Sequence, residues 1–138
     1  MGLARLRLPP SVRRAILDHA ARDPHRECCG LLVGAGRTVL FAVPIANVDS
    51  SAARYRIDDR AHIDLQRTLR SCVPRVRIIG VYHSHPHGSA QPSPADLAEA
   101  HYPDWVHVII GLGGPRPRLG AFLISEGRAR RLSVSGRR

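Results

Sequence analysis

The sequence contains no lysine: all 21 of its basic residues are arginine, and they give 138 residues a formal net charge of +10. Such a uniform use of arginine indicates genomic base composition rather than a dedicated binding patch. Aromatic residues make up only 4% of the chain, too few for a base-stacking surface. The charge permits an acidic partner through long-range attraction, but the composition argues against nucleic acid as the main partner.

Cysteines are also few. Cys28, Cys29 and Cys72 are odd in number and show no Cys-x-x-Cys spacing, which excludes a disulfide framework and a zinc ribbon. We expect reduced thiols that pack as small apolar residues. No apolar run is long enough to span a membrane, and residues 1–14 lack the apolar core of a secretory signal. These absences predict a cytoplasmic protein without membrane contact and leave its oligomeric state open, a homodimer included.

The length suits one domain with a single core, which we place at residues 1–135, followed by a frayed tail at 136–138. Helical and strand patterns alternate and end in a hairpin, which predicts an α/β fold with a mixed sheet flanked by helices. After an extended start at 3–8, we expect helices at 11–21, 59–72 and 94–101, and strands at 27–34, 38–43, 78–81, 105–112, 118–125 and 128–134, with a brief extended piece at 54–57.

The stretch that organises the chain is the buried strand at 78–81, whose end carries His83 and His85. Side chains alternate along a strand, so histidines separated by one residue point to the same side. Pro86 cannot continue a sheet ladder and should end the strand there. An isolated His-x-His is more often coincidence than a metal site, so this pair predicts a metal site only together with a third ligand.

A candidate third ligand follows after a short loop. Ser93 can cap the next helix, Pro94 suits its first position, and Asp96 falls in its first turn. On its own, Ser-x-x-Asp indicates helix capping. Combined with His83 and His85, it predicts a metal site of two imidazoles and one carboxylate, with the fourth corner of a zinc tetrahedron open for catalysis.

Other metal sites fit less well. A TIM-barrel hydrolase needs roughly 250 residues, and a metallo-β-lactamase pattern would need aspartate and histidine where His87 and Gly88 stand. A deaminase would need a Cys-x-x-Cys that is missing. His87 remains an alternative ligand, although it follows a strand-breaking proline, and Cys28 or Cys29 could approach the metal.

The motifs around Glu27-x-Cys29-Gly30, His83-Ser84-His85-Pro86 and Ser93-x-x-Asp96 together resemble the JAMM/MPN+ metallopeptidase family over nearly the whole chain. The resemblance implies a curved, cytidine-deaminase-like α/β fold and a Zn²⁺ cofactor. It also implies metal ligation by His83, His85 and Asp96, with water as the fourth ligand. Glu27 would then be the general base, and Ser93 would stabilise the oxyanion, while Ser84 would shape the site.

Compact members of this family are similar to bacterial enzymes that process ubiquitin-like sulfur-carrier proteins. The resemblance therefore implies hydrolysis of the bond after the carrier's C-terminal Gly-Gly, as a peptidase or isopeptidase. Two alternatives stay open at this point. One is a catalytically silent MPN-type scaffold that binds a partner protein, and the other is a nucleic-acid-associated protein of the RadC-like branch.

Overall fold

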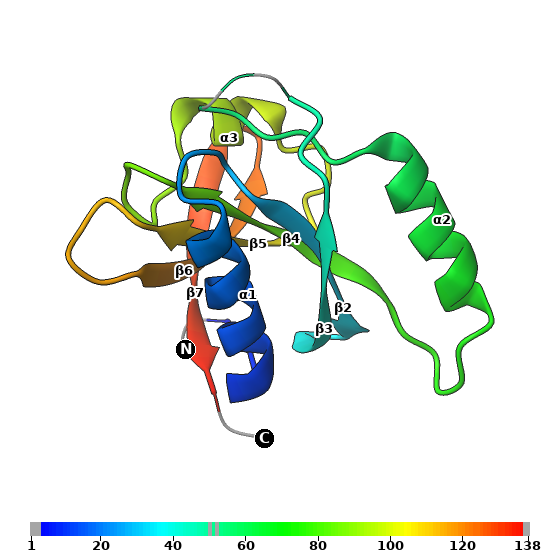
Figure 1. Cartoon of the computed structure of the whole chain (residues 1–138). Coiled ribbons are helices and arrows are strands. Elements are labelled where there is room, and N and C mark those ends of the chain that lie inside the picture. The colour runs from blue at the N-terminus through cyan, green and yellow to red at the C-terminus, as the bar shows by residue number, and fades with distance from the viewer. Residues whose placement is uncertain (1–3, 50, 52, 137–138) are drawn as a thin grey trace.

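The computed structural model of the chain, shown in Figure 1, describes residues 4–49, 51 and 53–136. In these ranges the chain forms one sheet and three helices. The strands are β1 (Arg5–Arg7), β2 (Cys29–Ala35), β3 (Thr38–Ile45), β4 (Arg77–His85), β5 (Val106–Gly111), β6 (Arg118–Ser125) and β7 (Arg128–Ser135), and the helices are α1 (Pro10–Arg22), α2 (Asp59–Arg70) and α3 (Pro94–Glu99).

The sheet has the strand order β1-β3-β2-β4-β5-β6-β7 and closes on itself through β1. The pair β4 and β5 is parallel, because α3 lies between them in the chain, whereas β2, β3, β6 and β7 join by antiparallel pairing. The predicted mixed α/β sheet is therefore confirmed. Its closure is an addition, since β1 runs parallel to both β3 and β7 where we expected only an extended start.

The main core lies between α1 and one face of the sheet. The buried side of α1 presents Val12, Ile16 and Ala20, spaced four residues apart as one helical face requires. These residues pack with buried side chains of β2, β4 and β5, among them Tyr82. A side chain at Gly30 would collide with the Tyr82 ring, so this glycine lets the tyrosine lie flat against β2.

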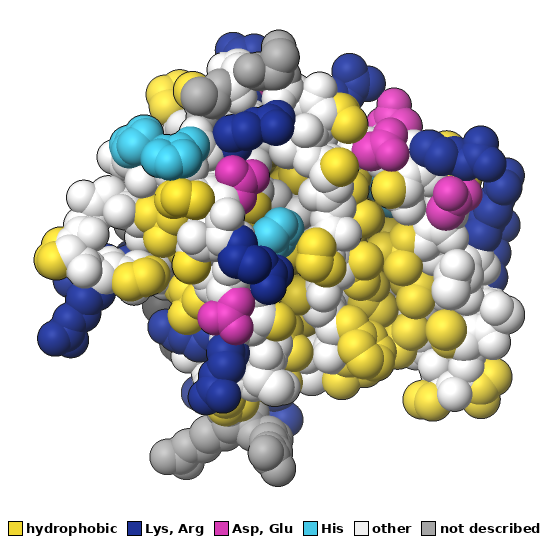
Figure 2. All heavy atoms as spheres, in the orientation of Figure 1, with side chains coloured by type: hydrophobic (Ala, Val, Ile, Leu, Met, Phe, Trp, Pro, Cys, Tyr) yellow, Lys and Arg dark blue, Asp and Glu magenta, His cyan; other side chains and the backbone are white. Residues whose placement is uncertain are grey.

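Helix α2 differs from α1 because none of its residues is buried. Figure 1 shows it standing at the side of the sheet, and Figure 2 shows hydrophobic side chains gathered between it and the rest of the molecule. The stripe that we expected on this helix is therefore only half-buried, and Ile63, which lies outside the stripe, is 45% exposed. The stripe comprises Ala61, Leu65, Leu69 and Cys72.

The expected boundaries differ from the structure at three further places. Helix α2 ends at Arg70, ahead of Cys72, and α3 ends at Glu99, ahead of His101. The extended piece at 54–57 forms no strand and is tied down by one bridge between Asn47 and Ile57. The tail at 136–138 stays a prediction, because residues 137 and 138 lie outside the described ranges, as does residue 3. No helix in the described part of the chain has the length and apolar character to cross a membrane.

Candidate metal centre

Strand β4 carries the histidine pair. It runs on to His85, so both histidines lie within the strand rather than beyond its end, and Pro86 follows where the strand stops. His83 and His85 point to the same side, and their Nε2 atoms lie 3.1 Å apart. His83 is fully buried and also lies in the sheet interior between β2 and β5, which fixes its backbone on both sides.

Helix α3 brings Asp96 to the pair. Ser93 is the N-cap: its Oγ accepts from the Asp96 N–H, and the Ser93 N–H donates to Asp96 Oδ2. The same Oδ2 lies 3.2 Å from His83 Nε2 and 3.0 Å from His85 Nε2. The predicted capping box is confirmed, and the cap holds the carboxylate in the orientation that the predicted metal site would need.

The loop between β4 and α3 is held close to β5. The Leu112 N–H donates to the His85 carbonyl, and a side chain at Gly111 would collide with the backbone of the loop at Ser89. This contact lets the Ser89 carbonyl accept a hydrogen bond from His85 Nδ1 at 2.8 Å. The loop therefore orients the second histidine, as outer partners of metal-binding histidines commonly do.

The three donor atoms fit a cation better than they fit one another. Ser89 offers His85 only an acceptor, so a proton sits on Nδ1. Burial acts to lower the pKa of His85, but hydrogen bonds with Asp96 and the Ser89 carbonyl outweigh it and raise that pKa. A bound cation would displace any proton from Nε2, and the lone pairs of the three donor atoms would then converge on the cation. Donor atoms of a tetrahedral site with bonds of about 2.0 Å lie about 3.3 Å apart, close to the observed 3.0 to 3.2 Å.

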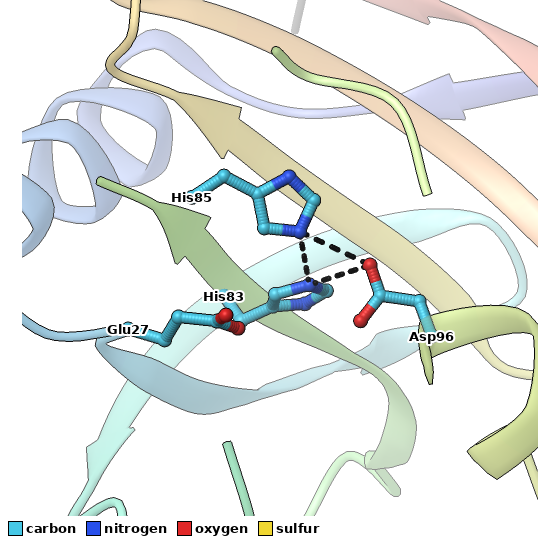
Figure 3. A group of neighbouring side chains, drawn as sticks. All are labelled: Glu27, His83, His85 and Asp96. Atoms are coloured by element: carbon cyan, nitrogen blue, oxygen red, sulfur yellow. Dashed lines mark hydrogen bonds and ion pairs between the residues drawn. The ribbon is translucent and has the colours of Figure 1, made fainter. Parts of the chain in front are cut away.

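Glu27 completes the cluster just ahead of β2. It is 5% exposed, and one ligand atom each from Glu27, His83, His85 and Asp96 lie within 4.8 Å of one another (Figure 3). Two contacts hold the Glu27 backbone: Asn47 Nδ2 donates to its carbonyl, and the next residue donates its N–H to Ser84 Oγ. Ser84 therefore positions the glutamate segment and is itself fully buried.

The two carboxyl groups of the site, those of Glu27 and Asp96, have pKa values shifted in opposite directions. Burial raises the pKa of Glu27 to about 7, against a lowering effect of His85 and with a smaller raising effect of Asp96. Burial also acts to raise the pKa of Asp96, but hydrogen bonds with His83 and His85 outweigh it and hold that pKa well below its usual range. Asp96 is thus a permanent anion, suited to binding a cation, whereas Glu27 can exchange a proton near neutral pH.

Burial lowers the pKa of His83, which favours the neutral ring that a metal ligand needs. Its Nδ1 has no hydrogen-bond partner among the described residues. The ring is held instead by Tyr55, which stacks on it with centroids 4.2 Å apart and an interplanar angle of 21°. Sequence analysis missed Tyr55, because residues 54–57 showed only an extended pattern with nothing to relate them to the histidines.

The structure brings together the predicted residues Glu27, His83, His85 and Asp96, with Ser93 beside them as the cap of α3. It does not bring in the alternatives. His87 is exposed and is not part of the cluster, and Cys29 directs its Sγ toward the Ile45 carbonyl. Asn47 and Ser89 were also missed, because both contribute through contacts with backbone groups that leave no residue pattern.

Comparisons with known proteins agree with this geometry. Residues 9–122 match the family described as prokaryotic homologs of the JAB domain. The chain is 33% identical to the desampylase of Haloferax volcanii over 98% of this chain and 99% of that protein. It is 35% identical to a probable TtuB-protein conjugate cleaving protease of Thermus thermophilus, over 84% and 76% of the two chains.

A solved structure supports the same assignment. Protein DSY2949 from Desulfitobacterium hafniense superimposes with a TM-score of 0.83 at 28% identity, over 94% of this chain and 91% of that chain. The resemblance drawn from the sequence motifs is therefore confirmed. The chain belongs to the family of prokaryotic homologs of the JAB domain, the JAMM-type fold.

Proposed function

We propose that the chain is a zinc-dependent peptidase or isopeptidase that hydrolyses the bond after the C-terminal Gly-Gly of a ubiquitin-like, sulfur-carrier-type protein. The observation that carries this proposal is the convergence of His83, His85 and Asp96 beside Glu27, a buried carboxyl whose pKa is raised to about 7. Two imidazoles and one carboxylate form the ligand set of many catalytic zinc sites and leave one position for water or substrate.

The chain's own residues supply the proton transfers. Bound zinc would lower the pKa of a water molecule to about 7 and polarise the scissile carbonyl. Glu27 accepts the proton from the attacking water, because its pKa lies near neutrality, and then delivers that proton to the leaving amine. The bond between the carbonyl carbon and this amine breaks as the proton arrives, which gives a free carboxylate and a free amine.

We assign Ser93 to stabilisation of the oxyanion. Its Oγ is only an acceptor in the cap of α3, so the hydroxyl proton can still be donated to the substrate oxygen. The capping box fixes Ser93 relative to Asp96, and a preorganised donor of this kind contributes roughly 2.7 to 4 kcal/mol to transition-state stabilisation.

The substrate class follows from the relatives. One is named a desampylase and another a protease that cleaves protein conjugates, and compact members of the family resemble processing enzymes for sulfur carriers. We therefore infer that the acyl part of the substrate is the tail of a small ubiquitin-like protein. The cytoplasmic location expected from the sequence accords with such a substrate.

The test is Glu27→Gln, assayed by mass spectrometry on a carrier protein joined through its terminal Gly-Gly to a second protein. We expect the variant to bind zinc as the wild type does and to lose roughly 10²–10⁴-fold in turnover, the range of general acid-base catalysis. Full turnover by zinc-loaded Glu27→Gln would refute its role as the base. A wild type that binds far less zinc than protein would instead favour the silent scaffold.

A further inference from the structure

A cavity of about 440 Å³ lies beside the candidate metal centre, on the same face of the sheet. Asp96 lines it at one end, and its floor is formed by Leu31, Val81 and His107, which are paired across β2, β4 and β5. Glu27 is not among its lining residues. The cavity therefore extends from the metal ligands on the side away from the general base.

Aromatic residues are concentrated around this cavity. The whole chain has only six tryptophan, tyrosine and phenylalanine residues, and three of them, Tyr55, Tyr102 and Trp105, line it. The rings of Tyr102 and Trp105 stack with centroids 4.0 Å apart. The ring of His62 on α2 is tilted against Trp105, with ring centroids 5.5 Å apart. A sequence so poor in aromatic residues has placed half of them around one hollow, which indicates a surface built to hold a ligand.

Two histidines that line the cavity have imidazole nitrogens without a hydrogen-bond partner in the described ranges. Nε2 of His62 and Nε2 of His107 are buried without a hydrogen-bond partner among the described residues. His107 is 5% exposed and lies in the floor of the cavity, so its ring cannot turn outward to bond with bulk water. A buried polar atom without a partner costs free energy. Two such atoms in one cavity point to a guest that supplies the missing partners.

The surrounding charges decide the chemistry of that guest. Burial lowers the pKa of His107 to about 4, so the ring is neutral at neutral pH and offers one N–H and one lone pair. Four carboxylates also line the cavity, against a single arginine, Arg56; they belong to Asp49, Asp59, Asp96 and Glu99. An anionic guest would be repelled, whereas a neutral peptide group, which both donates and accepts, suits the pair of imidazoles.

The distance from the metal centre sets which peptide group this is. His107 is level with Val81, two residues before His83 on β4, which corresponds to about 7 Å at the rise of a β-strand. An extended substrate covers that distance in about two residues. Since Glu27 delivers the proton to the leaving amine and lies off the cavity, the acyl part of the substrate occupies it.

On the basis of the proposed function, we propose that His62 and His107 are specificity residues that hydrogen-bond the main-chain peptide group of the substrate tail about two residues before the scissile bond. They hold the tail in an extended conformation over Leu31 and Val81, and they do not contact the reacting atoms. The pair therefore selects for a tail whose backbone can lie flat in the cavity, as a tail ending in small residues can.

The kinetic test uses His107→Phe and His62→Leu in the zinc-loaded protein, with His87→Phe as a matched control on an exposed histidine. Each of the first two variants should raise KM for a carrier conjugate so that kcat/KM falls about tenfold, with kcat little changed, because one buried hydrogen bond is lost from the bound state. The control should match the wild type. If His107→Phe fails to fold, His62→Leu still tests the pair, since the His62 residue as a whole is only half-buried.

A second readout separates this inference from the proposed reaction. We would record long-range ¹⁵N spectra of the histidine rings while titrating a product peptide that ends in Gly-Gly. Saturable shifts of both Nε2 signals, together with the KM effect, support the pair as the anchor. Unchanged signals with normal kinetics in both variants overturn it, even if the wild type cleaves. Shifts without any cleavage overturn the proposed reaction and keep the anchor.

Discussion

Strand β4 presents two faces that are built in opposite ways. Toward α1, Tyr82 is 1% exposed, and its hydroxyl is bonded to His19 Nδ1 at 2.7 Å. Toward α2, the next residue, His83, is equally buried, but its Nδ1 has no hydrogen-bond partner in the described part of the chain. Its Nε2 lies 3.1 Å from His85 Nε2 and 3.2 Å from Asp96 Oδ2, distances that suit ligand atoms around one cation. One residue step along the chain separates a satisfied core from an unsatisfied site.

The difference shows that one face of the sheet stabilises the fold and that the other face destabilises it. The α1 face collects Leu6, Leu8, Ile16 and their neighbours in one apolar cluster. The other face keeps a buried carboxyl, orphaned imidazole nitrogens and a helix that buries nothing. Sites of this kind destabilise a protein, and the surrounding core has to hold them in place. The experiments below act on one face at a time.

The largest effect is expected when the site face loses a ligand. In His83→Asn, the zinc affinity should fall by more than about 100-fold, since loss of an outer partner of a metal ligand alone costs 10–100-fold. Turnover should then drop to the level of chelator-treated wild type. Competition titration with a zinc indicator and the conjugate cleavage assay measure both. A variant that keeps stoichiometric zinc and full turnover would remove His83 from the ligand set.

The next effect belongs to the core face. Ile16→Ala empties a fully buried position on α1 and should lower the free energy of unfolding by about 2–5 kcal/mol. Chemical denaturation measures the loss. Leu17→Ala on the same helix is the control, and it should cost less because that side chain is only half-buried. If the folded Ile16→Ala protein also loses zinc affinity, the two faces are not independent.

The same contrast explains what could be read from the sequence. The convergence of His83, His85 and Asp96 depends on local rules, namely alternation along a strand and the first turn of a capped helix, so short-range spacing was enough. The role of Glu27 came only from the family resemblance, because 55 residues of the sequence separate it from His83, the first of its neighbours in the site. Tyr55 also depends on tertiary placement, and no periodicity records it.

The misjudged parts of the fold have a similar cause. Helical spacing on α2 shows which residues share a face, but not whether anything covers that face, and the structure leaves it half open. Strand β1 is only three residues long, too short to give a pattern of alternation, yet it closes the sheet. A sequence therefore predicts an element well when its residue pattern is long enough to recognise, but it does not show which other element packs against it.

A smaller effect is expected from the charge of Glu27 in metal-free protein. Its pKa is raised from an ordinary 4.5 to about 7 in the folded state, so the folded protein holds the proton more tightly than the unfolded chain. Between these two values the free energy of unfolding falls as the pH rises, and above pH 7 the whole cost is present. Glu27→Gln should remove that cost.

Denaturation of the chelated proteins tests this sign. At pH 8, Glu27→Gln should be more stable than the wild type by on the order of 2 kcal/mol, and the gain should shrink toward zero near pH 4. Glu126→Gln, in an exposed turn, is the matched control for the loss of one glutamate charge outside the site. A gain that is constant over this range would mean that the effect comes from packing rather than from ionisation.

The smallest effect is expected on the side of β4 that faces α1, where the polar groups have hydrogen-bond partners. Tyr82→Phe removes the hydroxyl that His19 contacts and should cost about 1 kcal/mol of unfolding free energy, the typical net value of one hydrogen bond. The ring still fills its place over Gly30, so the sheet and the neighbouring His83 should keep their positions. Because only packing and one hydrogen bond act on this face, kcat and zinc affinity should match the wild type while denaturation shows the loss. If turnover falls by more than the fraction of unfolded protein explains, the change at Tyr82 has altered the site on the other face of β4, and the two faces are coupled.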